Sequence, residues 1–336
     1  MHDRTEATRD GAALPPFLAS HPAFRRVFAP GKLTIGFIAP LEGYPAGAAP
    51  TMRDHEATVR KADEAGFAAL WLRDVPFLDP GFGDVGQIFD PFVYLGFLAA
   101  ITRTMSIGTA GIVLPLRDPL IVAKQAASAD HLLGGRFLMG LSSGDRPTEY
   151  PAFGLDFDNR VERFRDAVCI IRAATQGSFA RHLSEHYGTL DGSIDLVPKP
   201  VRGRLPTIAI GRAGQSFEWL AQSMDAFIWH GSDVRRLSGI VPRWRALSPQ
   251  GVFRPYGYGT FFDLSEDPGA PLQPGQVLRG GRDALIDLLY AHQEEGVSHV
   301  MLNMKAARRP AAAVIDELAQ HVLPLFPAHE TNHGEE

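Results

Sequence analysis

The sequence lacks the features by which many enzyme classes are identified. Its 336 residues include one cysteine, Cys169, so a disulfide within the chain and a CxxC-type metal site are both excluded. HExxH, GxSxG and histidines at metal-ligand spacing are missing too, which leaves zinc and serine hydrolysis unsupported, and we expect no metal site. Cys169 itself follows Val168 in an apolar run, where a small core residue is more common than a nucleophile.

Long apolar runs and a basic stripe are missing as well. The most apolar stretch, residues 91–100, is far shorter than the ~20 residues that a membrane span needs. The N-terminal residues are charged and contain no apolar segment typical of a secretory signal. With 33 basic and 38 acidic residues the formal net charge is −5, and no cluster of basic residues predicts a nucleic-acid partner. We therefore expect a soluble, cytoplasmic protein that binds neither membrane nor nucleic acid.

What the chain does contain is a regular alternation of strand-like and helix-like segments. Apolar runs predict buried strands at residues 33–39, 68–72, 106–114, 136–141, 207–210, 226–229, 256–262 and 299–303. Helical spacing follows each of them, at residues 52–65, 91–101, 119–133, 157–174, 215–224, 234–246, 282–295 and 310–321. Eight such units predict an α/β fold, a single (β/α)₈ TIM-barrel domain over residues 1–336. A doubly wound open sheet is the alternative, and the missing strand–GxGxxG–helix unit counts against it.

Three segments depart from this alternation. The two ends, residues 1–20 and 328–336, are polar or irregular and are predicted to be flexible. Residues 176–205 form a long stretch rich in glycine and proline after the fourth helix. We interpret it as a hairpin or lid inserted into the barrel, since it is not a domain boundary in an otherwise regular pattern.

The C-terminal ends of the barrel strands are where an active site is expected. After the fifth strand, just before a helix, come Gly211, Arg212, Ala213, Gly214, Gln215 and Ser216. Backbone N–H groups at a helix start, together with a guanidinium, suit a phosphate, although a turn ending in an N-cap serine is the simpler interpretation of this segment alone. The loop after the fourth strand repeats the pattern with Ser142, Ser143 and Gly144, which favours a phosphorylated cofactor.

Charged residues at two other strand ends are candidates for catalysis. Arg73 and Asp74 end the second strand, and they either belong to the site or pair with neighbouring loop residues. His230 ends the sixth strand, where it can serve as an acid or base or as a hydrogen-bonded structural residue.

At these residues the sequence resembles the bacterial luciferase-like flavin monooxygenases. Residues 108–160, which include TAGIVLP and the helix PLIVAKQAASADHLLGGR, are similar to the central motif of the family. Residues 62–75 resemble its second unit and residues 204–229 its fifth and sixth strands, so the resemblance extends in order over about residues 33–326. LWLRDVPFLDPGFGDVGQIFDP with SSGDRPTEYPAFG is similar to a luciferase-type oxidoreductase subgroup of unassigned substrate.

The resemblance implies a non-covalent FMN whose ring lies over the end of the third strand, at Ala110 and Gly111. Members often have a non-proline cis peptide bond there, and the phosphate would lie between the strand-four loop and residues 212–216. Reduced FMN would act with oxygen on a small organic substrate, with electrons from NAD(P)H or a separate flavin reductase. A deazaflavin that transfers hydride is the alternative cofactor. A homodimer is also implied, through the second and third helices, with Phe92, Tyr94, Phe97 and Leu98 at the contact or in the core.

One position departs from the family pattern. Many members carry a histidine just after the acidic residue that ends the second strand, and here that residue is Val75, so no acid–base role can be transferred to it. The departure leaves open a non-catalytic flavin-binding protein. Arg73 makes the same loop more cationic, so it would orient an anionic substrate or stabilise an anionic reduced flavin.

Overall fold

The computed structural model describes residues 12–230 and 237–329, and eight parallel strands form a closed barrel in it. Around the barrel the strands are β1 (Thr34–Ile38), β2 (Ala69–Leu72), β3 (Ser106–Thr109), β5 (Phe137–Ser142), β8 (Thr207–Ile210), β9 (Ala226–His230), β10 (Tyr256–Leu264) and β12 (His299–Asn303). The β9–β10 and β12–β1 pairs close the circle. The predicted barrel is confirmed, and the open-sheet alternative is wrong.

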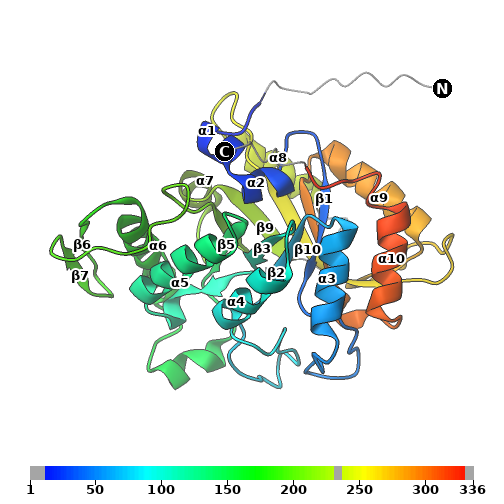
Figure 1. Cartoon of the computed structure of the whole chain (residues 1–336), viewed down its shortest axis with the longest axis horizontal. Helices are drawn as coiled ribbons and strands as arrows, with labels where there is room; N and C mark the ends of the chain where they lie inside the picture. Colours follow the sequence, from blue (N-terminus) through cyan, green and yellow to red (C-terminus); the bar gives the residue numbers. More distant parts are fainter. Residues whose placement is uncertain (1–11, 231–236, 330–336) are drawn as a thin grey trace.

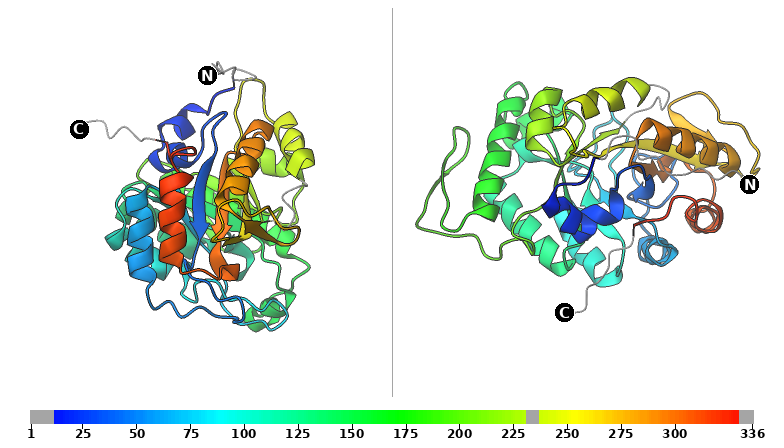
Figure 2. Two further views of the ribbon diagram at one scale, coloured as in Figure 1. Left: turned by 90° about the vertical axis from the view of Figure 1, so that its right-hand side faces the viewer. Right: turned by 90° about the horizontal axis from the view of Figure 1, so that it is seen from above.

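A helix follows each barrel strand and lies outside it (Figures 1 and 2). They are α3 (His55–Ala65), α4 (Pro91–Ile101), α5 (Pro119–Leu132), α6 (Arg160–Gln176), α7 (Phe217–Ser223), α8 (Leu237–Ala246), α9 (Arg282–Glu295) and α10 (Ala311–His321). The predicted beginning of α8, at residue 234, lies outside the described residues. None of the helices in the described part of the chain is long and apolar enough to cross a membrane.

The helix starts show why these segments fold where they do. Asp90 and Asp118 precede α4 and α5, and each carboxylate accepts hydrogen bonds from two backbone N–H groups of the first turn. A proline follows each aspartate at the first helical position, where its missing N–H costs nothing and its φ angle is already helical. Gly66 ends α3 in the left-handed conformation, with φ at 90°, which only glycine adopts without strain.

The N-terminal end of the barrel is covered by α1 (Pro16–Ser20) and α2 (Pro22–Val27), which Figure 2 shows above the strands. Phe24 and Phe28 are fully buried against the barrel interior, in one cluster with Trp71 and Met301. Residues 1–20 were predicted to be flexible. Of these, residues 1–11 lie outside the described part, but α1 is an ordered helix because its Leu18 is buried in the same cluster.

Residues after α6 form an antiparallel hairpin of β6 (Arg181–Leu183) and β7 (Thr189–Asp191), which projects to one side in Figure 1. The hairpin interrupts the alternation without adding a strand to the barrel, so the insertion after the fourth barrel helix is real. The prediction that Cys169 is a core residue is wrong. Cys169 is exposed on α6, because the buried stripe of that helix passes through Val168 and Ile171 on its other side.

Candidate functional site

A cavity of about 610 Å³ lies at the C-terminal ends of the strands. Pockets that bind small molecules commonly measure about 300–1,000 Å³, so this one can hold a cofactor-sized molecule. The candidate residues that the structure brings together in its wall are Arg73, Asp74, Ala110, Gly111, Ser142, Ser143, Gly144, Gly211, Arg212, Ala213, Gly214 and His230. Gln215 and Ser216 do not line it.

The segment predicted as one long third strand is divided by a bend at Ala110 and Gly111. β3 ends at Thr109, and it is followed by the short strand β4 (Ile112–Val113) and then by the 3₁₀-helix η1 (Leu114–Leu116). Gly111 has a φ of +98°, and a Cβ at that position would lie 2.8 Å from the Ser142 hydroxyl. Only glycine therefore allows Ser142 this close, and the Ser142 hydroxyl donates a hydrogen bond to the Gly111 carbonyl at 3.2 Å.

The expected cis bond between Ala110 and Gly111 is wrong. The cis bonds in the described residues precede Pro40 and Pro198. The left-handed glycine bends the chain instead, and β3 and β4 both run parallel to β5 on either side of an ordinary trans peptide.

The loop after β8 has the shape of an anion-binding concavity. Gly211, Ala213 and Gly214 have φ angles of +67°, +50° and +72°. Ala213 holds a conformation that costs energy for any residue with a side chain, and such positions cluster at ligand sites. In the described part of the chain, the backbone N–H groups of Ala213 and Gly214 have no hydrogen-bond partner. Successive free N–H groups in this geometry suit a phosphate.

Gln215 and Ser216 shape this loop from behind. The buried Gln215 amide donates to the Val161 carbonyl at 3.0 Å, which ties the loop to α6. Ser216 caps α7, because its hydroxyl accepts a hydrogen bond from the Trp219 N–H at 3.1 Å. Ser216 is therefore the N-cap of the simpler interpretation, and the assignment of Gln215 and Ser216 to the cofactor contacts stays a prediction.

Arg212 lies exposed at the edge of the cavity. Its Nε and one terminal nitrogen donate to the Gln215 carbonyl at 3.2 and 3.1 Å, and the guanidinium lies over the Phe217 ring. These contacts hold the cation beside the free N–H groups of the loop.

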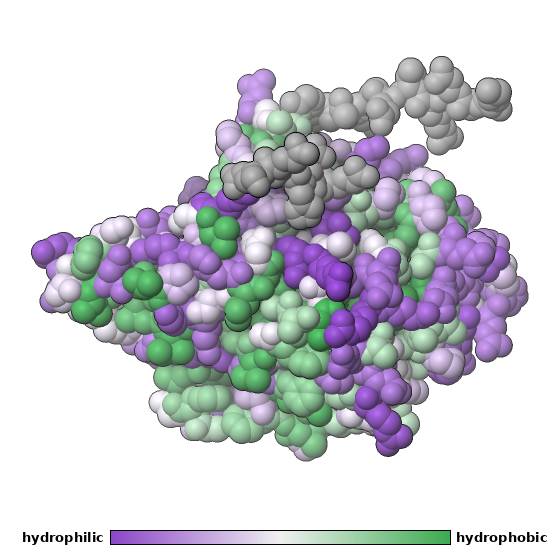
Figure 3. All heavy atoms as spheres, viewed as in Figure 1, coloured by the Kyte–Doolittle hydropathy of each residue, from purple (hydrophilic) through white to green (hydrophobic). Residues whose placement is uncertain are grey.

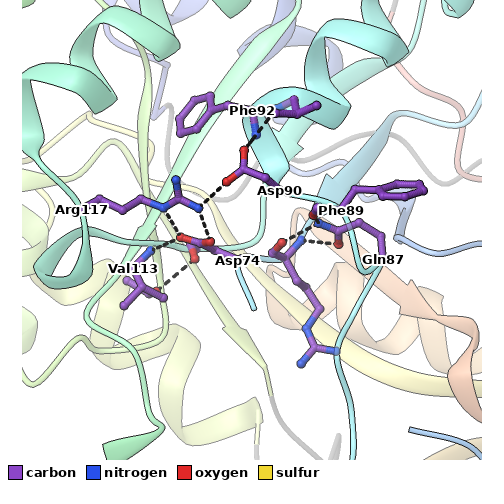
Figure 4. Close-up of polar contacts among 11 residues, drawn as sticks. Asp74, Gln87, Phe89, Asp90, Phe92, Val113 and Arg117 are labelled. Atoms are coloured by element: carbon purple, nitrogen blue, oxygen red, sulfur yellow. Dashed lines mark hydrogen bonds and ion pairs between the residues drawn. The ribbon is translucent and has the colours of Figure 1, made fainter. Parts of the chain in front are cut away.

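Asp74 is fixed by an ion pair (Figure 4). Its carboxylate accepts from Arg117 Nε at 2.8 Å and from a terminal nitrogen of Arg117 at 2.6 Å, and also from the Val113 N–H. Arg117 also contacts Asp90 at 2.7 Å; although burial acts to lower the pKa of Arg117, the two carboxylates raise it above its usual range. The Asp74 side chain is 4% exposed. Of the two interpretations, it therefore fits a residue that pairs with a loop neighbour, Arg117, and its bond to the Val113 N–H holds β4 beside the cavity.

Arg73 is held in the wall by backbone and side-chain contacts. The Gln87 side chain accepts from the Arg73 N–H at 3.0 Å and donates to its carbonyl at 2.6 Å (Figure 4). The guanidinium pairs with Asp84, which also accepts from the Tyr44 hydroxyl at 3.0 Å. Burial alone would raise the pKa of Asp84, but Arg73 holds it below its usual value. Arg73 is thus a fixed cation at the cavity, with its charge partly balanced.

His230 and Val75 complete this side of the cavity. Although the His230 side chain is exposed at the end of β9, the protein packed around it, and then the charge of Arg73, lower its pKa below the usual value. The imidazole packs edge-on against Phe261, with ring centroids 5.4 Å apart. His230 is therefore neutral near pH 7 and able to exchange a hydrogen bond, whereas the Val75 side chain can only exclude water.

Sequence reasoning did not assign four charged residues of the wall to the site: Asp145, Arg146, Glu149 and Arg160. Arg146 donates to the Asp84 carbonyl at 2.9 Å, and Arg160 lies 3.6 Å from the centroid of the Phe157 ring. Glu149 lies in the 3₁₀-helix η2 (Pro147–Phe153). The sequence did contain a signal for them. They lie in the segment that directly continues the strand-four loop, and that segment must cover the same end of the barrel.

An eight-stranded parallel barrel whose strand ends surround a cavity of this composition is the architecture of a TIM-barrel enzyme. The sequence profile of the luciferase-like monooxygenases matches residues 33–251, well over half of the chain. The protein belongs to the luciferase-like monooxygenase family.

Two relatives with named activities illustrate the family. The chain is 28% identical over 185 residues to a 4-hydroxyprotoasukamycin monooxygenase of Streptomyces nodosus subsp. asukaensis, covering 54% of this chain and 47% of that one. It is 26% identical over 164 residues to the alkanal monooxygenase alpha chain of Photorhabdus luminescens, covering 48% and 43%. The chain thus matches less than half the length of either relative.

Solved structures share the whole barrel. A monooxygenase from Streptomyces bottropensis superposes with a TM-score of 0.72 at 17% identity, covering 88% of this chain and all of that one. An F420-dependent secondary alcohol dehydrogenase in complex with an F420–acetone adduct gives 0.71 at 17%, covering 87% and 98%. The oxygenating constituent of 3,6-diketocamphane monooxygenase from Pseudomonas putida, in complex with FMN, gives 0.68 at 13%, covering 89% and 100%. Identities this low show the fold alone.

Proposed function

We propose that the protein is an FMN-dependent oxidoreductase, a monooxygenase that acts on a small organic substrate. The observation that carries the proposal is the pairing, in one cavity, of free N–H groups at Ala213 and Gly214 with the Arg212 guanidinium. Bound FMN would supply the redox chemistry, taking electrons from NAD(P)H or arriving reduced from a separate flavin reductase.

The residues present fit the cofactor. The loop of residues 211–214 would hold the phosphate, since charge-assisted hydrogen bonds from Arg212 and two N–H groups suit a dianion. The bend at Ala110 and Gly111 leaves the end of β3 without a side chain larger than methyl, so a flat ring can lie against it. Arg73 and the neutral His230 would face the substrate side, where they bind and orient it.

Titration of the purified protein with FMN, followed by flavin fluorescence, tests the proposal. We expect saturable binding at micromolar concentrations, stronger for FMN than for riboflavin. Absence of binding at tens of micromolar, with oxidised and with reduced FMN, contradicts it.

The fold shared with an F420-dependent dehydrogenase supports a second candidate, hydride transfer from a deazaflavin. Parallel titrations with FMN and a deazaflavin distinguish the cofactors. An oxygen electrode separates the reactions, because only the monooxygenase consumes oxygen in step with substrate. FMN binding without turnover of reduced flavin across a broad substrate panel would instead indicate the non-catalytic flavin-binding protein that Val75 leaves open.

A further inference from the structure

One carboxyl group in the cavity wall is buried without a partner. Glu149 is 5% exposed, and its Oε1 makes no hydrogen bond in the described part of the chain. A buried acceptor without a hydrogen bond destabilises the folded chain, and more so when it is charged. The carboxyl group borders the cavity, so a molecule bound there can supply the missing contact.

The other carboxyl groups in the wall are in different environments. Asp74 is neutralised by two hydrogen bonds from Arg117, and Asp145 is exposed to solvent. Arg146, the cation nearest to Glu149 in sequence, uses one terminal nitrogen for the Asp84 carbonyl and lies over the Phe82 ring. Among the described acids of the wall, Glu149 alone is both buried and without an ion-pair partner.

This environment changes how Glu149 ionises. Burial raises the pKa of the carboxyl to about 7; Arg146 acts to lower it, and the nearby Asp74 and Asp145 act to raise it further. A group that is half protonated near neutral pH gives and takes protons most effectively under those conditions.

We propose that Glu149 donates the proton that dioxygen takes up when it is reduced in this cavity. The inference rests on the proposed flavin function. Bound reduced FMN would supply the two electrons and, in its anionic form, one proton, so that dioxygen would need one further proton to become hydrogen peroxide. The Glu149 O–H bond breaks, an O–H bond forms on the reduced oxygen, and the carboxylate regains a proton from water.

The first test is a titration of the protein without cofactor. ¹³C NMR of the glutamate carboxyl groups is recorded against pH for the wild type and for Glu149→Gln. We expect one resonance with a midpoint near 7 that is absent from the variant. Glu162→Gln is the matched control, because Glu162 is exposed in the first turn of α6 and should leave that resonance in place. A Glu149 midpoint in the ordinary range near 4–5 overturns the inference.

The second test measures reoxidation of bound reduced FMN by oxygen as a function of pH. In the wild type we expect the rate to fall as pH rises through about 7, because a smaller fraction of Glu149 then carries the proton it has to donate. Glu149→Gln should lose this pH dependence and react at least about tenfold more slowly at pH 6, with unchanged FMN affinity. An unchanged pH profile in the variant, with FMN bound, overturns the role of Glu149 alone. If neither protein binds FMN, the proposed function fails and the inference fails with it.

Discussion

At the scale of single residues, the proposed binding of phosphate by Arg212 can be tested separately from its support of the loop. It borders the cavity beside the free N–H groups of the loop, and its guanidinium also lies over the Phe217 ring. Arg243 on α8 lies over the same ring at 4.8 Å but does not line the cavity. The two arginines therefore share a structural contact and differ in access to the proposed phosphate.

We predict that Arg212→Ala weakens FMN binding by about tenfold to a hundredfold, because a charge-assisted bond contributes roughly 1.5–3 kcal/mol at 1.4 kcal/mol per decade. Riboflavin, which lacks the phosphate, should lose far less. Arg243→Ala should leave both affinities unchanged. Equal losses for both ligands, measured by fluorescence titration, would show that Arg212 supports the loop and does not bind phosphate.

The residue scale is also where sequence reasoning reached its limit. The strand ends could be located from the pattern, so Arg73, Asp74, Arg212 and His230 were correctly placed around one cavity. The direction in which a side chain points could not be predicted from the pattern, since it depends on partners that are distant in sequence. Asp74 turns toward Arg117, 43 residues away, and the burial of Glu149 depends on how η2 folds over the cavity.

At the scale of elements, the bend between β3 and β4 has two requirements that can be tested apart. Gly111→Ala meets both a left-handed backbone and a 2.8 Å contact with Ser142. Gly134, just after α5, has a φ of +60° with no atom within 4 Å of an added Cβ, so Gly134→Ala meets only the first. We predict a loss of about 1–2 kcal/mol in the free energy of unfolding for Gly134→Ala, and a clearly larger loss for Gly111→Ala, together with weaker FMN binding. Urea denaturation measures the free energy of unfolding of both variants. Equal losses for Gly111→Ala and Gly134→Ala would show that the Ser142 contact is unimportant.

Helix α4 carries the contact proposed for a homodimer. Tyr94 and Leu98, two of the residues expected there, are core residues at 3% and 0% exposure. Val93 and Phe97 are instead exposed at 75% and 38%, and Figure 3 shows apolar side chains gathered over the part of this face where α4 lies. A contiguous apolar surface of this kind favours association. We predict a dimer in light scattering at micromolar concentration and a monomer for Val93→Glu, with unchanged helicity; a monomeric wild type contradicts the proposal.

At the scale of the whole molecule, a hydrogen-bonded chain joins the barrel interior to the helices that cover its N-terminal end. The Trp71 N–H donates to His299 Nε2 at 2.9 Å, so the neutral ring carries its proton on Nδ1 and donates it to the Thr34 hydroxyl at 2.8 Å. That hydroxyl donates in turn to the Val27 carbonyl of α2 at 2.7 Å. Burial lowers the pKa of His299 to about 3, because a charged ring would lose the Trp71 bond and have no water around it.

This chain makes the fold sensitive to acid in a defined window. Above about pH 6.5 His299 is neutral in both states, but as pH falls toward 3 the unfolded chain binds a proton that the folded chain refuses, so the free energy of unfolding decreases. We predict that His299→Gln, although less stable at pH 7, loses stability less steeply between pH 6 and 5, by up to about 1.4 kcal/mol per pH unit, the effect of one proton. His131→Gln, which removes an exposed histidine on α5, should keep the wild-type slope. Urea denaturation at closely spaced pH values measures these slopes, and parallel curves for the wild type and His299→Gln would show that His299 binds its proton equally in the folded and unfolded chain.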